Sequence, residues 1–357
     1  MAPAPEARIH GIVESTVTAI LPFLLGLLPV LAFLVALMLI DSFKLVRPRM
    51  VVQTILVGGI AAAAGYLINS RLADIIPLDP TDFSRYVAPW VEECIKIAFV
   101  VYLVSSRRVG FAVDSAINGF AVGAGFAFVE NLYYLKTLAD APLAAWVVRG
   151  FGTAIMHGGT TAVFAIMARA LTERWGERNV LAFLPGLVFA VALHSLFNHF
   201  ILPPVISTAV MVVVFPLMVA VVFKRSEKAT RQWLGTGLDS DLELLDLITS
   251  GKISDSHVGL YLENLRHRFP VEVVVDMLCY MRLHLELALQ AKGVMMLRQA
   301  NLNFRRDPEL PHQLAELRHL ERHIGVTGKL AITPFLRTSS RDLWQIFMLN
   351  DQRPLRA

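Results

Sequence analysis

Acidic, basic, imidazole and amide side chains recur inside four stretches of the sequence that are otherwise apolar. They are Glu92, Glu93 and Lys96 in residues 88–104, Glu130 and Asn131 in 111–135, His157 in 146–171, and His194 and Asn198 in 180–202. An ionisable side chain in the hydrocarbon core of a membrane costs about 2.5–3.5 kcal/mol on insertion scales, so a cluster of such side chains indicates function. Carboxylates and imidazoles serve as general acids and bases, and both bind metal ions.

Helical spacing sorts these residues into pairs. Lys96 follows Glu92 by four positions and Glu93 by three, so it can neutralise either carboxylate. The carboxylate left over, beside an ionised neighbour in a medium of low dielectric constant, is suited to accept a proton as a general base. His194 and Asn198 are four positions apart and share a helix face, where an imidazole and an amide can polarise a carbonyl group or stabilise an oxyanion.

The composition requires that membrane helices position these residues. Of the 357 residues, 55% are hydrophobic and 17% are charged, which excludes an ordinary soluble protein. Seven segments are long and apolar enough to span a bilayer: 17–40, 51–69, 88–104, 111–135, 146–171, 180–202 and 207–223. We therefore predict an all-α, polytopic membrane bundle of about seven transmembrane helices within residues 1–228.

Residues 229–357 differ in character from the rest. They contain 31 of the 62 charged residues and no apolar run long enough to span, while apolar residues recur at helical spacing. We predict a cytoplasmic α-helical domain with one helix starting near Asp239 and another ending near Gly293. Its 16 basic and 15 acidic residues argue against a nucleic-acid partner. A cytoplasmic protein partner of unknown identity is expected instead.

Basic residues in the loops set the orientation, because Lys and Arg stay on the cytoplasmic side. One set of alternate loops contains twelve and the other five. We therefore expect a multi-pass protein of the inner membrane, with its N-terminus outside and its C-terminus in the cytoplasm.

In this orientation Glu92 and Glu93 lie about 6–8 Å below the outer boundary at about 1.5 Å per residue. Glu130 and His194 also fall in the outer half, which predicts one water-filled site facing outward, with Arg149 as an anchor at the outer interface.

Four motifs follow one another on consecutive spans. They are Glu92-Glu93-x-x-Lys96, Gly125-Phe126-Ala127-x-x-Glu130-Asn131, His157, and His194-x-x-Phe197-Asn198. Over residues 15–225 this pattern resembles the PrsW family of bacterial intramembrane proteases, distant relatives of the CAAX prenyl proteases. The resemblance implies hydrolysis of a peptide bond in a membrane-anchored protein, such as an anti-sigma factor, on the extracytoplasmic side.

The resemblance also implies roles for the residues. Either Glu92 or Glu93 would take a proton from the attacking water, and His194 and Asn198 would stabilise the oxyanion. Lys96 and Asn131 would support the site.

Two mechanisms stay open for these roles. A Zn2+ ion bound by Glu130, His157 and His194 with an open fourth position is one. A metal-free glutamate mechanism is the other. Apart from both mechanisms, Glu130, Asn131 and His157 could serve as structural hydrogen-bonding groups between helices.

Two other classes of function use similar residues. Chains of intramembrane Glu, His and Lys also occur in proton- or ion-coupled transporters, and a catalytically inactive membrane scaffold would retain the same fold. The polar residues here form one outer layer, and the sequence has no inverted repeat, so we favour the protease. New peptide termini in a candidate substrate would indicate hydrolysis, whereas flux into vesicles would indicate transport.

Overall fold

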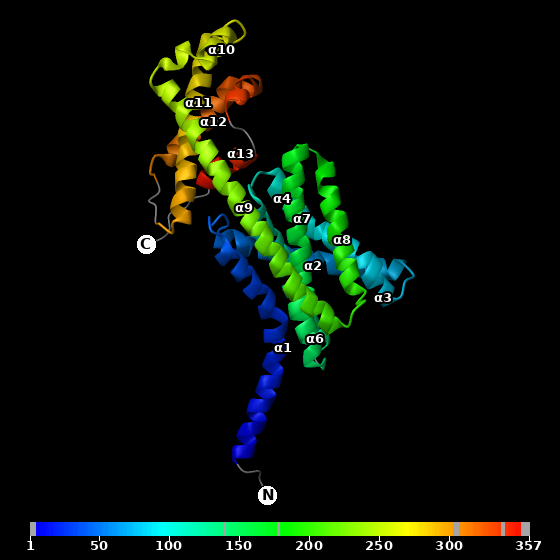
Figure 1. Cartoon of the computed structure of the whole chain (residues 1–357). Coiled ribbons are helices and arrows are strands. Elements are labelled where there is room, and N and C mark those ends of the chain that lie inside the picture. Colours follow the sequence, from blue (N-terminus) through cyan, green and yellow to red (C-terminus); the bar gives the residue numbers. More distant parts are fainter. Residues whose placement is uncertain (1–4, 139, 177–178, 303–306, 337–339, 351–357) are drawn as a thin grey trace. The chain divides into compact units, whose positions relative to one another are not determined.

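The computed structural model describes residues 5–138, 140–176, 179–302, 307–336 and 340–350, and every regular element among them is helical (Figure 1). The predicted all-α class is confirmed. The chain divides into two compact units. Unit 1 comprises Met1–Asp41, Leu45–Ser106 and Ala112–Lys224, and unit 2 comprises Ser42–Lys44, Arg107–Phe111 and Arg225–Ala357.

Six stretches of helix in the described residues are long and apolar enough to cross a membrane. Four of them belong to single helices: Ile20–Ile40 of α1 (Pro5–Ile40), α2 (Pro48–Ile75), α5 (Ala112–Thr137) and a part of α9 (Pro204–Thr249). The fifth, Leu143–Trp175, comprises α6 (Leu143–Val147), η2 (Val148–Thr153) and α7 (Ala154–Trp175). The sixth, Val180–Asn198, comprises η3 (Val180–Phe183) and α8 (Leu184–Asn198). The chain is thus a multi-pass membrane protein. The remaining predicted span forms α4 (Ala88–Ser105), which differs from these six in having three charged residues within its 18 residues.

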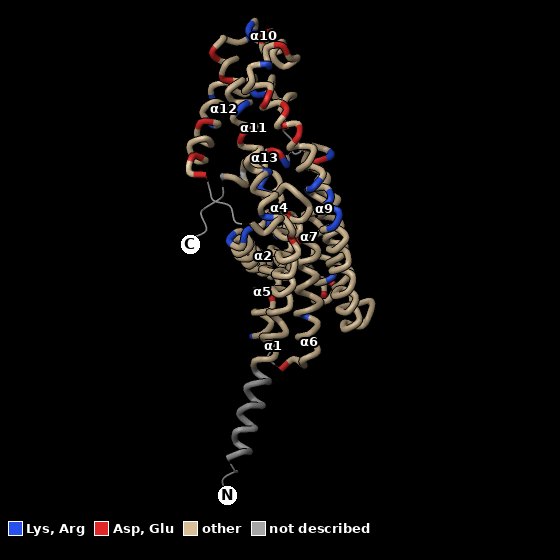
Figure 2. Tube along the Cα trace, turned by 60° about the vertical axis from the view of Figure 1, so that its left-hand side comes forward, with Lys and Arg blue, Asp and Glu red and all other residues tan. Residues whose placement is uncertain are grey.

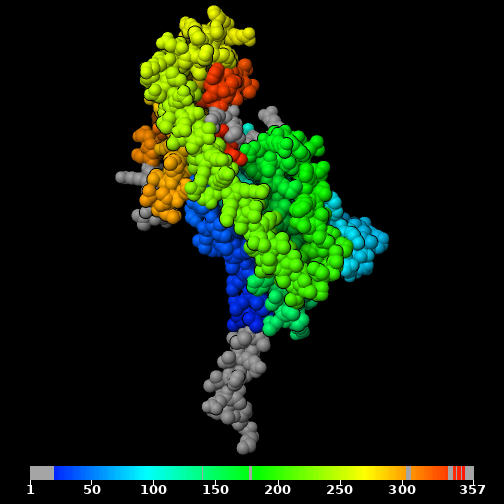
Figure 3. Space-filling model, viewed as in Figure 1, coloured from blue at the N-terminus to red at the C-terminus, as the bar shows by residue number. Residues whose placement is uncertain are grey.

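Charged residues are unevenly distributed along the chain. Figure 2 shows long uncharged stretches through the helices of unit 1 and frequent charges on α10 (His257–Leu265), α11 (Val271–Gln299) and α12 (Leu310–Ile332) of unit 2. The outer faces of the unit 1 helices are apolar. On α2, for example, Leu56, Ile60 and Leu67 are each more than 60% exposed, which is the pattern of helices that face lipid. The unit 1 part of α9 also lies on the outside of its bundle (Figure 3).

The helix α5 lies at the centre of unit 1 and packs against α7, α2 and α1. Nearly every residue in its first four turns is buried. Two glycines make the close approach possible: a Cβ atom on Gly123 would lie 2.1 Å from the carbonyl oxygen of His157 in α7, and one on Gly125 would lie 2.0 Å from that of Ile55 in α2. A larger residue at either position would push the helices apart.

In unit 2, α11 packs against α12 and α13 (Ser340–Asn350). A buried ion pair joins Lys292 to Asp241, with Nζ 2.5 Å from Oδ2, and Trp233 Nε1 donates to Asp342 Oδ1 at 3.1 Å. Met277 and Met281 lie in its core with no exposed surface. Both aromatic and charged residues therefore stabilise this unit, as its mixed composition predicts.

Two predicted helix boundaries in this part of the chain are wrong. The helix α9 continues from Pro204 to Thr249, through Pro216 and without a start at Asp239. Likewise α11 passes through Gly293, since one helical glycine costs only about 1 kcal/mol relative to alanine and longer-range packing overrides it. The helix α9 ends at Thr249, and Gly251 follows it with a φ of +75°, which suits glycine.

Candidate active site

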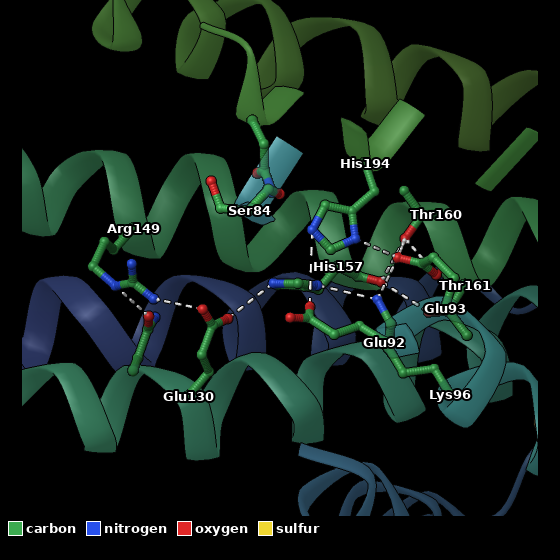
Figure 4. A network of polar contacts seen from close by, with 12 residues as sticks. Ser84, Glu92, Glu93, Lys96, Glu130, Arg149, His157, Thr160, Thr161 and His194 are labelled. Atoms are coloured by element: carbon green, nitrogen blue, oxygen red, sulfur yellow. Dashed lines mark hydrogen bonds and ion pairs between the residues drawn. The ribbon is translucent and has the colours of Figure 1, made fainter. Parts of the chain in front are cut away.

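The four helices that contain the predicted site residues bring most of them together in unit 1 (Figure 4). The cluster takes its members from α4, α5, α7 and α8, and they are Glu92, Glu93, Lys96, Glu130, His157 and His194. Asn131 lies beside this cluster, whereas Asn198 does not contact it. Most of the predicted set thus forms one continuous network.

Glu93 lies at the buried end of the network, with no exposed surface. Its Oε1 atom is 2.6 Å from Lys96 Nζ and 2.8 Å from His194 Nδ1. Thr160 Oγ1 also donates to Oε1, at 3.2 Å. A buried carboxylate is tolerated only with such pairing, so Glu93 is the acid that Lys96 neutralises.

His157 connects Lys96 to Glu130. Its Nδ1 atom lies 3.1 Å from Lys96 Nζ, and its Nε2 atom lies 2.9 Å from Glu130 Oε2. Because an ammonium group only donates hydrogen bonds, Nδ1 accepts and the ring proton lies on Nε2, toward Glu130. The His157 ring also stands edge-on to that of His194, with centroids 4.8 Å apart.

Glu92 is the most weakly paired of the three acids. Its side chain is 16% exposed, accepts a hydrogen bond of 3.1 Å from Asn69 Nδ2, and has Oε2 3.9 Å from His194 Nε2. Among the described residues no Lys or Arg lies within ion-pair distance of it. The pairs Glu93–Lys96 and Glu130–Arg149 therefore leave Glu92 as the acid of the cluster without a basic partner among the described residues.

Asn198 contacts the polypeptide elsewhere, although we predicted that it joins His194 at an oxyanion. Its Nδ2 atom donates to the main-chain carbonyl of Ser84 at 2.9 Å, and the neighbouring Ser195 Oγ donates to that of Arg85 at 2.7 Å. Both carbonyls belong to η1 (Phe83–Val87), the π-helical turn directly before α4. Asn198 thus fastens the start of the helix that contains Glu92 and Glu93.

The sequence pattern of the PrsW family intramembrane metalloproteases matches residues 47–222. The chain belongs to the PrsW family. It is accordingly an intramembrane protease, and the matched segment contains every member of the cluster. No curated protein and no solved structure matches the chain.

The PrsW description implies a metal ion, and three side chains of the cluster offer donor atoms for one. Ligand atoms of Glu92, His157 and His194 all lie within 4.8 Å of one another. Two imidazoles and one carboxylate are a known ligand set of catalytic zinc. Each imidazole also has a ring nitrogen close to a second carboxylate, Glu130 for His157 and Glu93 for His194, as histidine ligands in metal sites usually do. The residues therefore fit a metal ion.

This set differs from the predicted ligands in one residue, because Glu92 takes the place of Glu130. Oε1 of Glu130 accepts a hydrogen bond of 3.1 Å from Arg149 Nη2, and Oε2 lies 2.9 Å from His157 Nε2. Sequence spacing could not distinguish the two acids, since both lie on helices that face the same centre.

Three members of the network were not predicted. Thr160 follows His157 by three positions and so shares its helix face, a signal that the sequence did contain. Asn69 and Arg149 lie at the ends of spans. Arg149, expected as an interfacial anchor, instead pairs with Glu130, and nothing in the sequence indicated this partner.

Proposed function

We propose that this chain is a zinc-dependent intramembrane protease and that Glu92, His157 and His194 hold the metal. The observation that carries the proposal is the closeness of their ligand atoms, within 4.8 Å, in a buried polar cluster. A charge count supports it. Three carboxyl groups face two cations, Lys96 and Arg149, so one carboxyl group, that of Glu92, is left without a basic partner among the described residues and is available to a metal.

A bound zinc ion would supply Lewis acidity that polarises the scissile carbonyl group. The chain's own residues prepare the site. Glu93 accepts the Nδ1 proton of His194, which leaves Nε2 as the electron-pair donor on the side of Glu92. Glu130 lies beside Nε2 of His157, and Nδ1 of this ring would exchange its hydrogen bond from Lys96 for the metal. Glu93 is therefore a positioning residue here, and Glu92 is the acid of the pair that faces the reacting atoms.

We propose a membrane-anchored protein as the substrate, cleaved on the outer side of the inner membrane. The distribution of basic loop residues, twelve against five, supports an outside N-terminus and a cytoplasmic C-terminus. An anti-sigma-factor-like protein is the substrate that the family membership favours. Residues 229–357 would then form a cytoplasmic domain with a protein partner of its own.

The test uses the full chain co-expressed with single-span membrane proteins of its own cell, each tagged at both ends. Wild type should produce new termini on the outer side of one of them. The variants Glu92→Gln and His194→Ala should produce none while they still insert in the membrane. Arg71→Gln is the matched control, because Arg71 is exposed on α2 and lies outside the cluster. Cleavage at the wild-type rate by Glu92→Gln would refute the assignment.

A further inference from the structure

Arg149 lies on a π-helical turn that is fastened to the first helix of the chain. The turn η2 joins α6 to α7 without a break, and π-helical turns often occur at functional sites. Its Gly150 packs so closely on α1 that a Cβ atom there would lie 1.7 Å from the carbonyl oxygen of Leu25. The backbone that presents Arg149 is therefore held firmly in place.

The guanidinium group of Arg149 makes two directed hydrogen bonds to adjacent residues of α5. Nε donates to Asn131 Oδ1 at 2.9 Å, and Nη2 donates to Glu130 Oε1 at 3.1 Å. The ring of Tyr134 lies 3.6 Å from Cζ and covers one face of the group. Asn131 in turn donates to the carbonyl oxygen of Gly26 in α1, at 2.7 Å. Arg149 thus has a single orientation set by three contacts.

Glu130 lies between Arg149 and His157 and contacts both. One oxygen faces Arg149 and the other faces His157 Nε2, so a rotation that weakened one contact would also weaken the other. Figure 4 shows Arg149, Glu130 and His157 in a row that leads to Lys96 and Glu92. Lysine is a poor replacement for the arginine, because its compact ammonium group on a flexible stem lacks the planar fork that fixes the directions of the two bonds.

We infer that Arg149 is a positioning residue that holds the Glu130 carboxylate beside Nε2 of His157. The inference concerns the same site as the proposed function and rests on it for its role in proteolysis. The contacts between Arg149, Glu130 and His157 do not depend on bound zinc. The two can therefore be tested separately.

The first test is ¹⁵N NMR of the full-length, histidine-labelled protein in detergent without metal. The His157 signal is assigned by its loss in His157→Gln. Wild type should show one tautomer with the proton on Nε2. Both Arg149→Gln and Arg149→Lys should shift the His157 Nε2 signal, because the carboxylate beside it is no longer held in place, and the control Arg71→Gln should match wild type. An unchanged His157 signal in both Arg149 variants would overturn the inference, and using two variants guards against one that does not fold.

The second test measures Zn2+ affinity by competition with a chelator. Loss of an outer partner of a ligating histidine typically lowers metal affinity about 10–100-fold, and we expect that range for Arg149→Gln and for Glu130→Gln. The double variant should be no weaker than Glu130→Gln alone, because Arg149 acts through Glu130. Multiplying effects would overturn the inference. Absence of zinc binding by wild type would refute the proposed function instead, and the NMR result would still decide the role of Arg149.

Discussion

Neutralising the two adjacent glutamates one at a time should separate a structural charge from a reactive one. Glu93 has no exposed surface and lies 2.6 Å from Lys96. Glu93→Gln would leave that lysine as a buried cation without its counter-ion. Removing one partner of a buried ion pair costs about 3–5 kcal/mol. At roughly 2–4 °C per kcal/mol for a domain of this size, the midpoint of thermal unfolding should fall by about 6–20 °C.

Glu92→Gln is the matched variant, since the same chemical change occurs one residue away. Glu92 has no Lys or Arg partner among the described residues, and its hydrogen bond comes from Asn69. A glutamine oxygen can still accept this bond, so the free energy of unfolding should change by about 0.5 kcal/mol or less. Cleavage should nevertheless be lost, because this carboxylate faces the reacting atoms.

The assay follows thermal unfolding of the purified full chain in detergent by tryptophan fluorescence, alongside cleavage of the co-expressed substrate. The expected pattern is an unstable Glu93→Gln and a stable but inactive Glu92→Gln. Unfolding midpoints within 2 °C of each other would refute the assignment of the buried ion pair. Equal stability with activity lost only in Glu93→Gln would reverse the roles of the two acids.

Three further outcomes are expected. Burial lowers the pKa of His284 from 6.5 to about 4. Between these two pH values the unfolded state therefore binds a proton that the folded state does not. The free energy of unfolding of unit 2 should then fall by about 2 kcal/mol from pH 7 to pH 5, and His284→Phe, compared by urea unfolding, should lose that part of the pH dependence. Gly123→Ala should destabilise the protein and abolish cleavage, since its Cβ atom would meet the carbonyl oxygen of His157. By contrast Gly293→Ala, with open space at its Cβ position, should raise the free energy of unfolding by about 0.5–1 kcal/mol and leave cleavage unchanged; equal losses in both variants would contradict the packing argument. Asn198→Ala should reduce kcat by less than about tenfold, whereas a loss of about 10²–10³ would indicate an oxyanion donor.

Helical periodicity and the cost of burying charge were enough to predict the membrane bundle and the meeting of its polar residues. The spacing of Glu92, Glu93 and Lys96 allowed two pairings. The choice of Glu93 depends on donors from other helices, His194 and Thr160, and such partners are set by tertiary packing. Spacing along one helix contains no information about them.

The remaining differences have the same origin. Arg149 looked like an anchor because its position at a span end suits the interface, and only the π-helical turn directs it inward to Glu130. Asn198 shares a helix face with His194, as predicted, but the π-helical turn before α4 places the Ser84 carbonyl within its reach. The π-helical turns are therefore the features that the sequence pattern did not predict.

Zinc K-edge X-ray absorption of the purified, active full chain tests the central proposal most directly. We expect one zinc per chain with two imidazole nitrogens and a carboxylate oxygen among ligands at about 2.0–2.2 Å. The metal and the proteolytic activity should be lost together in His157→Ala and in His194→Ala. Full activity in protein that contains no metal, or stoichiometric zinc retained in both variants, would contradict the proposal.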